Sequence, residues 1–89
     1  MTDSDFIFYP GMDYVGYDIT RATNKTIDEL KIICKKNKKC LGFNTLGYLK
    51  WDISIDNLKS IPMFATGDSG LYVYSKRYNK IKKTRFLGF

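Results

Sequence analysis

The two cysteines, Cys34 and Cys40, are the residues of this sequence best suited to chemistry. They can form a disulfide, remain as two thiols or supply half of a metal site. Because the chain has no histidine and no third cysteine, it cannot build a closed tetrahedral zinc site without unusual carboxylate help. A bridge closing so short a loop would stabilise the domain by about 2 to 3 kcal/mol. Reduced thiols remain the alternative, since disulfides depend on the compartment.

The sequence lacks the usual groups of a catalytic site. It has no histidine to act as a general base, no glycine-rich phosphate loop and no nucleophile beside an activating group. Its aspartates are scattered, with no spacing that indicates pairing. They include Asp13, Asp18, Asp52, Asp56 and Asp68. We therefore expect a protein that is not an enzyme and that uses no metal or cofactor.

The net charge of +6 lies at the C-terminal end of the chain. Up to Ser75 there are nine basic and nine acidic residues, so residues 1–75 read as a neutral domain and residues 76–89 as a basic tail. The excess comes from Lys76, Arg77, Lys80, Lys82, Lys83 and Arg85. Such a tail could bind nucleic acid or another polyanion, or could simply be a solubilising terminus.

A second group of lysines lies between residues 31 and 39, at the end of an expected helix. It could bind anions there, although such a run is more often the solvated face of an amphipathic helix.

Aromatic residues with a neighbouring carboxylate offer a different kind of surface, suited to sugar rings or a protein partner. The candidates are Tyr14, Tyr17, Tyr48, Trp51 and Asp52. Most aromatics in so small a domain must also serve its core.

A helix is expected from Thr26 to about Asn37. Thr26 and Glu29 have the spacing of a capping box, and an apolar stripe follows at Ile27, Leu30, Ile33 and Cys34. Asn37 can adopt the left-handed conformation that ends a helix. These apolar side chains must be buried, and we expect a β-sheet to pack against them.

Strands are expected at residues 6–9, 40–44, 48–51 and 70–75, with turn residues between 44 and 47. In the last of these, Leu71 and Val73 should face one side of the sheet, and Tyr72 and Tyr74 the other. Residues 12–20 have no clear period and are expected to form an ordered loop. Residues 52–70 should be mostly irregular, with a short helical turn near 55–58.

At these elements the sequence resembles the PAN/apple family of small extracellular-type modules. The resemblance rests on the capped helix ending at Cys34, the pattern C-x5-C-x-G-F from Cys34 to Phe43, Tyr48-Leu49-Lys50 and the late GLYVY at 70–74. It implies an α+β domain, with one helix packed on a small twisted antiparallel sheet and Cys34 bridged to Cys40. It also implies binding of a protein or a carbohydrate. The second bridge of many family members is missing, since residue 30 is leucine.

No segment reaches the roughly 20 apolar residues of a membrane span. The first five residues are acidic and polar, where a signal peptide would be basic and then apolar. A disulfide would favour an oxidising compartment or a virion or cell surface. The residues leave the compartment, the ligand and the oligomeric state open.

Overall fold

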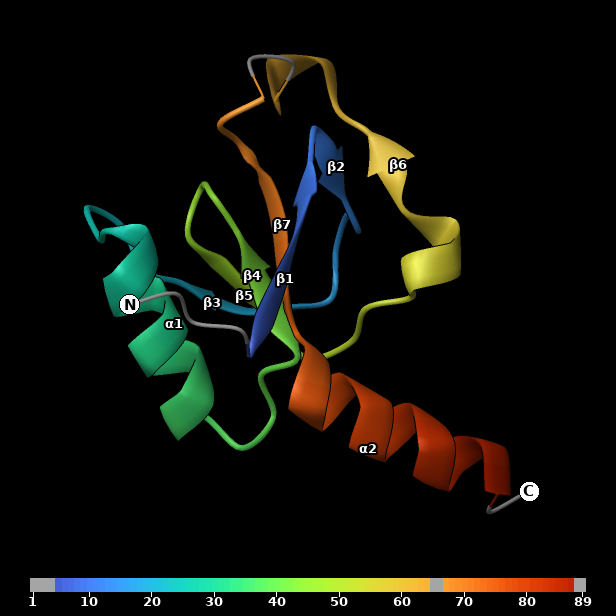
Figure 1. Ribbon diagram of the computed structural model, residues 1–89. Coiled ribbons are helices and arrows are strands. Elements are labelled where there is room, and N and C mark those ends of the chain that lie inside the picture. The colour runs from blue at the N-terminus through green and yellow to red at the C-terminus, as the bar shows by residue number, and fades with distance from the viewer. Residues whose placement is uncertain (1–4, 65–66, 88–89) are drawn as a thin grey trace.

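The computed structural model describes residues 5–64 and 67–87, with side chains as far as Lys82 (Figure 1). The expectation about a signal peptide concerned residues 1–5, and residues 1–4 lie outside the described part of the chain. Among the described residues, no helix combines the length and the apolar character needed to cross a membrane. The radius of gyration, 12.5 Å, is that expected for one compact domain of this length, and its helices and strands make it an α+β domain.

Five strands form the central sheet in the spatial order β1-β7-β4-β5-β3, and every neighbouring pair is antiparallel. They are β1 (Phe6–Pro10), β3 (Asp18–Arg21), β4 (Gly42–Asn44), β5 (Tyr48–Lys50) and β7 (Gly70–Tyr74). A smaller antiparallel sheet pairs β2 (Met12–Asp13) with β6 (Lys59–Ser60). Two short 3-10 helices are η1 (Ile55–Asn57) and η2 (Pro62–Phe64). The predicted antiparallel sheet is confirmed, as is the turn near residue 55.

The main helix, α1 (Ile27–Lys36), begins as predicted. The Thr26 hydroxyl accepts from the Glu29 backbone N–H at 3.1 Å, and the Glu29 carboxylate accepts from the Thr26 N–H at 2.8 Å. The helix also ends where expected, but Asn37 is extended, with φ −95°, and is not left-handed. The Asn37 side chain instead accepts a hydrogen bond from the Lys39 N–H, which turns the chain toward Cys40.

Strand β7 divides the core because its alternate side chains face opposite sides of the sheet. Tyr72 and Tyr74 pack on the layer beneath α1, and Leu71 and Val73 lie in the layer on the other face, as predicted. Buried in the first layer are Phe6, Leu30, Cys34, Cys40, Phe43 and Leu49. Buried with Leu71 and Val73 in the second are Leu41 and Ile53. In Figure 1, α1 lies on one side of the sheet and the segment carrying β6 on the other.

Two glycines are required by this packing. A Cβ atom at Gly42 would collide with the Tyr72 carbonyl of β7 and with the Ile53 side chain. Gly47 has φ +97°, in the left-handed region, at the turn between β4 and β5. The Asn44 side chain completes that turn by accepting from two backbone N–H groups. The hairpin is therefore fixed by local residues, as the sequence predicted.

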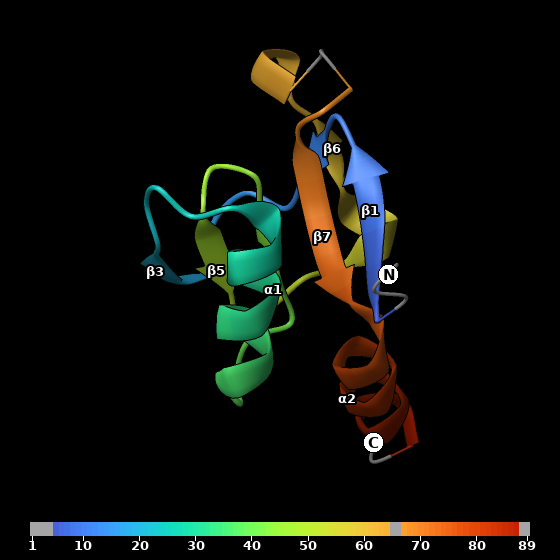
Figure 2. The same ribbon diagram turned by 60° about the vertical axis from the view of Figure 1, so that its left-hand side comes forward.

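Besides the conformation of Asn37, two sequence-based expectations are wrong. Residues 12–20 are not only a loop, because they contain β2 and the first part of β3. Residues 76–87, most of the expected basic tail, belong to a second helix, α2 (Ser75–Leu87), which continues from β7 and projects from the end of the sheet (Figure 2), while residues 88–89 lie outside the described part of the chain. Tyr78 and Ile81, three residues apart, pack against the second core layer. Ser75 is thus the first residue of a helix that continues directly from β7.

Candidate functional site

Three of the predicted ligand-binding aromatics lie together beyond the end of β5. The rings of Tyr14 and Tyr17 are stacked with centroids 5.1 Å apart, and Tyr17 meets Trp51 edge-on at 5.4 Å. Tyr17 is 45% exposed and Trp51 is 51% exposed. Tyr14 packs against the core, and loss of water contact raises the pKa of its phenol, as do Tyr17 and the charge of Asp52. The cluster thus presents the half-exposed rings of Tyr17 and Trp51 to solvent, while Tyr14 connects them to the core.

The backbone beneath these rings is held in an unusual conformation. Gly16 has φ +88° and Tyr17 has φ +59°, which is uncommon for a bulky residue. The Tyr17 carbonyl accepts from the Trp51 N–H at 3.0 Å, so the segment is tied to the end of β5. Left-handed residues of this kind persist only where their surroundings impose them, and they cluster at binding sites.

The surroundings that impose this conformation centre on Lys50, which is only 1% exposed. Its ammonium group lies 2.7 Å from the Asp18 carboxylate, 3.0 Å from the Gly16 carbonyl and 3.8 Å from Asp13 Oδ1. Asp13 is itself buried, and its other oxygen accepts from the Asn44 amide at 3.1 Å. A buried cation therefore holds both ends of the segment that carries Tyr14 and Tyr17.

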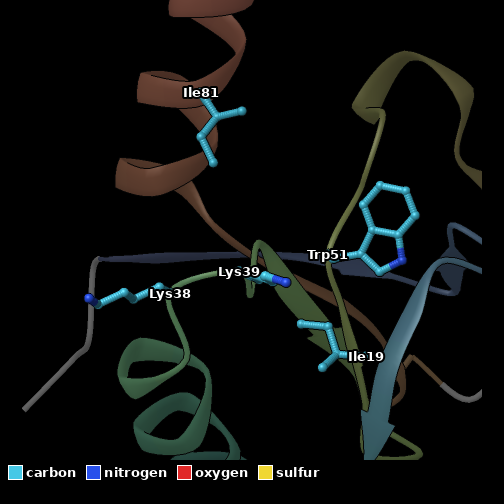
Figure 3. Close-up of a pocket in the computed structure, with 5 residues that line it drawn as sticks. All are labelled: Ile19, Lys38, Lys39, Trp51 and Ile81. Carbon is cyan, nitrogen blue, oxygen red and sulfur yellow. The ribbon is translucent and has the colours of Figure 1, made fainter.

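Beside the aromatic cluster lies an open groove of about 560 Å³ (Figure 3). Ile19 of β3 and Ile81 of α2 give it apolar walls, and Trp51 stands at one side. Lys38 and Lys39 reach it from the loop between α1 and β4. In Figure 3, Lys39 extends toward the side of Ile19 and Trp51, whereas Lys38 points to the opposite side. The groove is thus partly apolar, partly aromatic and cationic.

Helix α2 is locked to the rest of the site by Arg77. Its guanidinium donates to the backbone carbonyls of Cys34, Asn37 and Cys40 at 3.1, 2.6 and 2.6 Å, and to that of Lys35 at 3.0 Å. These carbonyls belong to the C-terminal end of α1 and to the loop closed by the Cys34–Cys40 disulfide. The bridge implied by the family resemblance is present, and Arg77 fixes α2 against it.

Comparison with known proteins gives a partial likeness. The chain is similar to a protein of Acanthamoeba polyphaga mimivirus named "Putative fucosyltransferase", with 34% identity over 83 residues. The aligned region covers 92% of this chain but 14% of the mimivirus protein, so the chain spans a small fraction of that relative's length. No family model matches the chain, and no solved structure matches it. Most of the mimivirus protein lies outside the aligned region.

The structure separates the remaining predicted site residues. Tyr48 lies at the opposite end of β5 from Trp51, where the Arg21 guanidinium stacks over its ring at 4.9 Å. Asp52 does adjoin the aromatic cluster, and its carboxylate pairs with Lys82 at 3.3 Å. The structure thus brings four of the five predicted ligand-binding residues together and leaves Tyr48 apart.

The six predicted polyanion-binding residues do not form one free arm. Arg77 is used inside the fold and Lys82 is ion-paired with Asp52, whereas Lys76 and Lys80 are exposed on α2. The side chains of Lys83 and Arg85 lie outside the described residues. The expectation of a free cationic tail fails for Arg77, because four backbone carbonyls surround its guanidinium.

Sequence reasoning missed Lys50 as the anchor of the site. It also found no pairing among the carboxylates, although Asp13 and Asp18 converge on that lysine. Among the described residues, no three His, Cys, Asp or Glu side chains are grouped so that they could hold a metal ion.

Proposed function

We propose that this chain is a PAN/apple-like interaction module that binds a carbohydrate and does not itself catalyse a reaction. The observation that carries the proposal is the pair of half-exposed rings, Tyr17 and Trp51, beside an open groove. A sugar ring has an apolar C–H face that packs on an aromatic ring, while its hydroxyls bond to polar groups nearby. A rigid aromatic surface also loses little conformational entropy on binding.

The PAN/apple assignment is supported by several features acting together. A capped helix leads into a disulfide between Cys34 and Cys40, and the C-x-G-F strand after it packs next to β7, with Gly42 required at the contact. Leu30, at the position where many family members form a second bridge, is 1% exposed, so apolar packing replaces the missing cross-link.

The partial relative favours a carbohydrate over a protein as the ligand. Its name, "Putative fucosyltransferase", refers to the transfer of a sugar. A domain that corresponds to 14% of that protein suits an accessory module that holds a glycan near a separate catalytic part. In support of a binding role, Asp18 and Asp52, the carboxylates adjoining the aromatic cluster, are each ion-paired with a lysine.

A second candidate is association with nucleic acid. Lys76 and Lys80 are exposed one helical turn apart on α2, and the whole chain carries a net charge of +6. Binding of this kind weakens steeply with salt because each engaged cation releases a counterion. A DNA titration at two salt concentrations therefore distinguishes it from binding in an aromatic groove.

The proposal is tested with a glycan array, followed by calorimetric titration of the strongest glycan. We expect Trp51→Ala to weaken binding by at least about tenfold, since an aromatic anchor contributes more than 1.4 kcal/mol. Met63→Ala is the matched control because Met63 is 67% exposed and does not line the groove. Absence of any glycan ligand, or equal binding by wild type and Trp51→Ala, would refute the proposal.

A further inference from the structure

The groove beside Trp51 has a fixed cationic wall. Lys38 and Lys39 belong to the loop between α1 and β4, and both are exposed. The Cys34–Cys40 disulfide closes this loop, and the Cys40 N–H donates to the Asn37 carbonyl at 2.9 Å. Arg77 binds the carbonyls at both ends of the loop. The two lysines are therefore presented from a preorganised backbone, which reduces the entropic cost of binding.

Two carboxylates that adjoin groove residues in the sequence, Asp18 beside Ile19 and Asp52 beside Trp51, are already matched by other cations. Asp18 lies 2.7 Å from the buried Lys50, and Asp52 lies 3.3 Å from Lys82. Among the residues that the structure describes, the groove is lined by two lysines, two isoleucines and one tryptophan, and by no carboxylate. The local field therefore favours an anion, and the apolar walls keep that anion close to a low-dielectric surface.

From this geometry we propose that the groove binds an anionic sugar residue, a pyranose carrying a carboxylate or a sulfate. Its apolar face packs on Trp51, and its anionic group meets Lys39, whose side chain extends toward the Trp51 side of the groove (Figure 3). Lys38, which points to the opposite side, meets a neighbouring unit of the chain. The inference rests on the proposed carbohydrate function and adds the charge of the ligand.

The test is calorimetry at about 0.15 M salt, an ionic strength that screens exposed charges beyond a Debye length. Three hexasaccharides are compared: neutral chitohexaose, carboxylated hyaluronan, and chondroitin sulfate, which also carries sulfate. We expect at least one anionic hexasaccharide to bind about tenfold or more tighter than chitohexaose, because hydrogen bonds to an ionised group are roughly twice as strong as neutral ones. The hyaluronan and chondroitin sulfate arms show whether a carboxylate suffices.

Single substitutions show which lysine is responsible for the preference for an anionic sugar. Lys39→Gln should remove most of the preference for the anionic sugar, and Lys38→Gln should remove less of it. Lys76→Gln, an equal change of charge on α2 outside the groove, should leave it unchanged. An equal loss with Lys76→Gln would indicate diffuse charge attraction and overturn the inference.

Two further outcomes separate this inference from the proposed function. Equal binding of chitohexaose and the anionic sugars, with Trp51→Ala still harmful, overturns the anionic preference and leaves carbohydrate binding intact. Binding of none of the three hexasaccharides also overturns it, and the glycan array then decides whether any carbohydrate function remains.

Discussion

Lys50→Met should be among the most destabilising single substitutions in this domain. Lys50 is 1% exposed, and its ammonium group is the cation facing Asp13, whose carboxylate is buried as well. Methionine fills much of the lysine volume, so the main effect is electrostatic: Asp13 is left as a buried charge without its counterion. Breaking a buried pair in this way costs about 3 to 5 kcal/mol. An 89-residue domain has only about 4 to 13 kcal/mol of stability in total.

The assay is urea unfolding followed by the fluorescence of Trp51, the single tryptophan of the chain, which is hydrogen-bonded to the segment that Lys50 anchors. Asp18→Asn should cost less than about 1 kcal/mol, because the Asp18 side chain is 36% exposed. If Lys50→Met proves too unstable to measure, the double variant Asp13→Asn with Lys50→Met keeps the question open to experiment. It removes both charges, and an asparagine oxygen can still accept from Asn44.

We expect the double variant to be more stable than Lys50→Met, and to fold even if Lys50→Met alone does not. Where all three variants can be measured, the double variant should be at least about 1 kcal/mol more stable than the sum of the two single effects predicts. Additive effects, or a cost of Lys50→Met below about 1 kcal/mol, would show that the Lys50 contacts act like a surface ion pair. The reasoning about the segment that carries Tyr14 and Tyr17 would then be wrong. A folded Lys50→Met protein should also bind glycan more weakly, because its aromatic rings would no longer be held in place.

Three other measurements test the framework around the site. Arg77→Ala should lower the free energy of unfolding in urea by about 2 to 3 kcal/mol, because four backbone carbonyls lose a charged hydrogen-bond donor. A decrease of less than about 0.5 kcal/mol would mean that Arg77 does not hold α2 against the end of α1. Leu30→Ala should cost about 2 to 4 kcal/mol and Thr26→Ala only about 1, and the reverse order would contradict the assigned helix face. The backbone N–H of Thr26, and then its side chain, lower the pKa of Glu29. The ionised Glu29 carboxylate therefore stabilises the folded protein above the usual carboxyl pKa near 4.3, and this contribution is lost as the pH falls through the lowered pKa. Thermal melts of wild type and Glu29→Gln should accordingly differ at pH 7 and converge at pH 3; a difference that persists at pH 3 would exclude the carboxylate as its source.

Much of the fold could be predicted because its signals are local. The capping box at Thr26 and Glu29 fixes the start of α1, and Gly47 with Asn44 fixes the turn between β4 and β5. Alternation along β7 sorts its side chains onto two faces of the sheet. Each of these features depends on residues within a few positions of one another, and so each is visible in the sequence.

The second helix could not be predicted in this way. Residues 75–87 are mainly basic and polar, and among the side chains described there, as far as Lys82, Tyr78 and Ile81 pack on the core. Their three-residue spacing is a weak signal alone. The segment is helical in the domain because those two side chains find an apolar layer and because Arg77 finds the carbonyls at the end of α1. Most helical stability in proteins comes from such packing and not from propensity.

The sequence by itself determined α1 and the strands β1, β4, β5 and β7, and it singled out Tyr14, Tyr17, Trp51 and Asp52, which the structure brings together. Only the tertiary structure decided that Lys50 is buried between Asp13 and Asp18, which lie 37 and 32 positions earlier, and that the groove draws its walls from four separate parts of the chain. The physical reason is the separation along the chain over which each kind of interaction acts. Backbone propensities act over a few residues, whereas the burial of a charge depends on which distant groups the strand order brings to meet it.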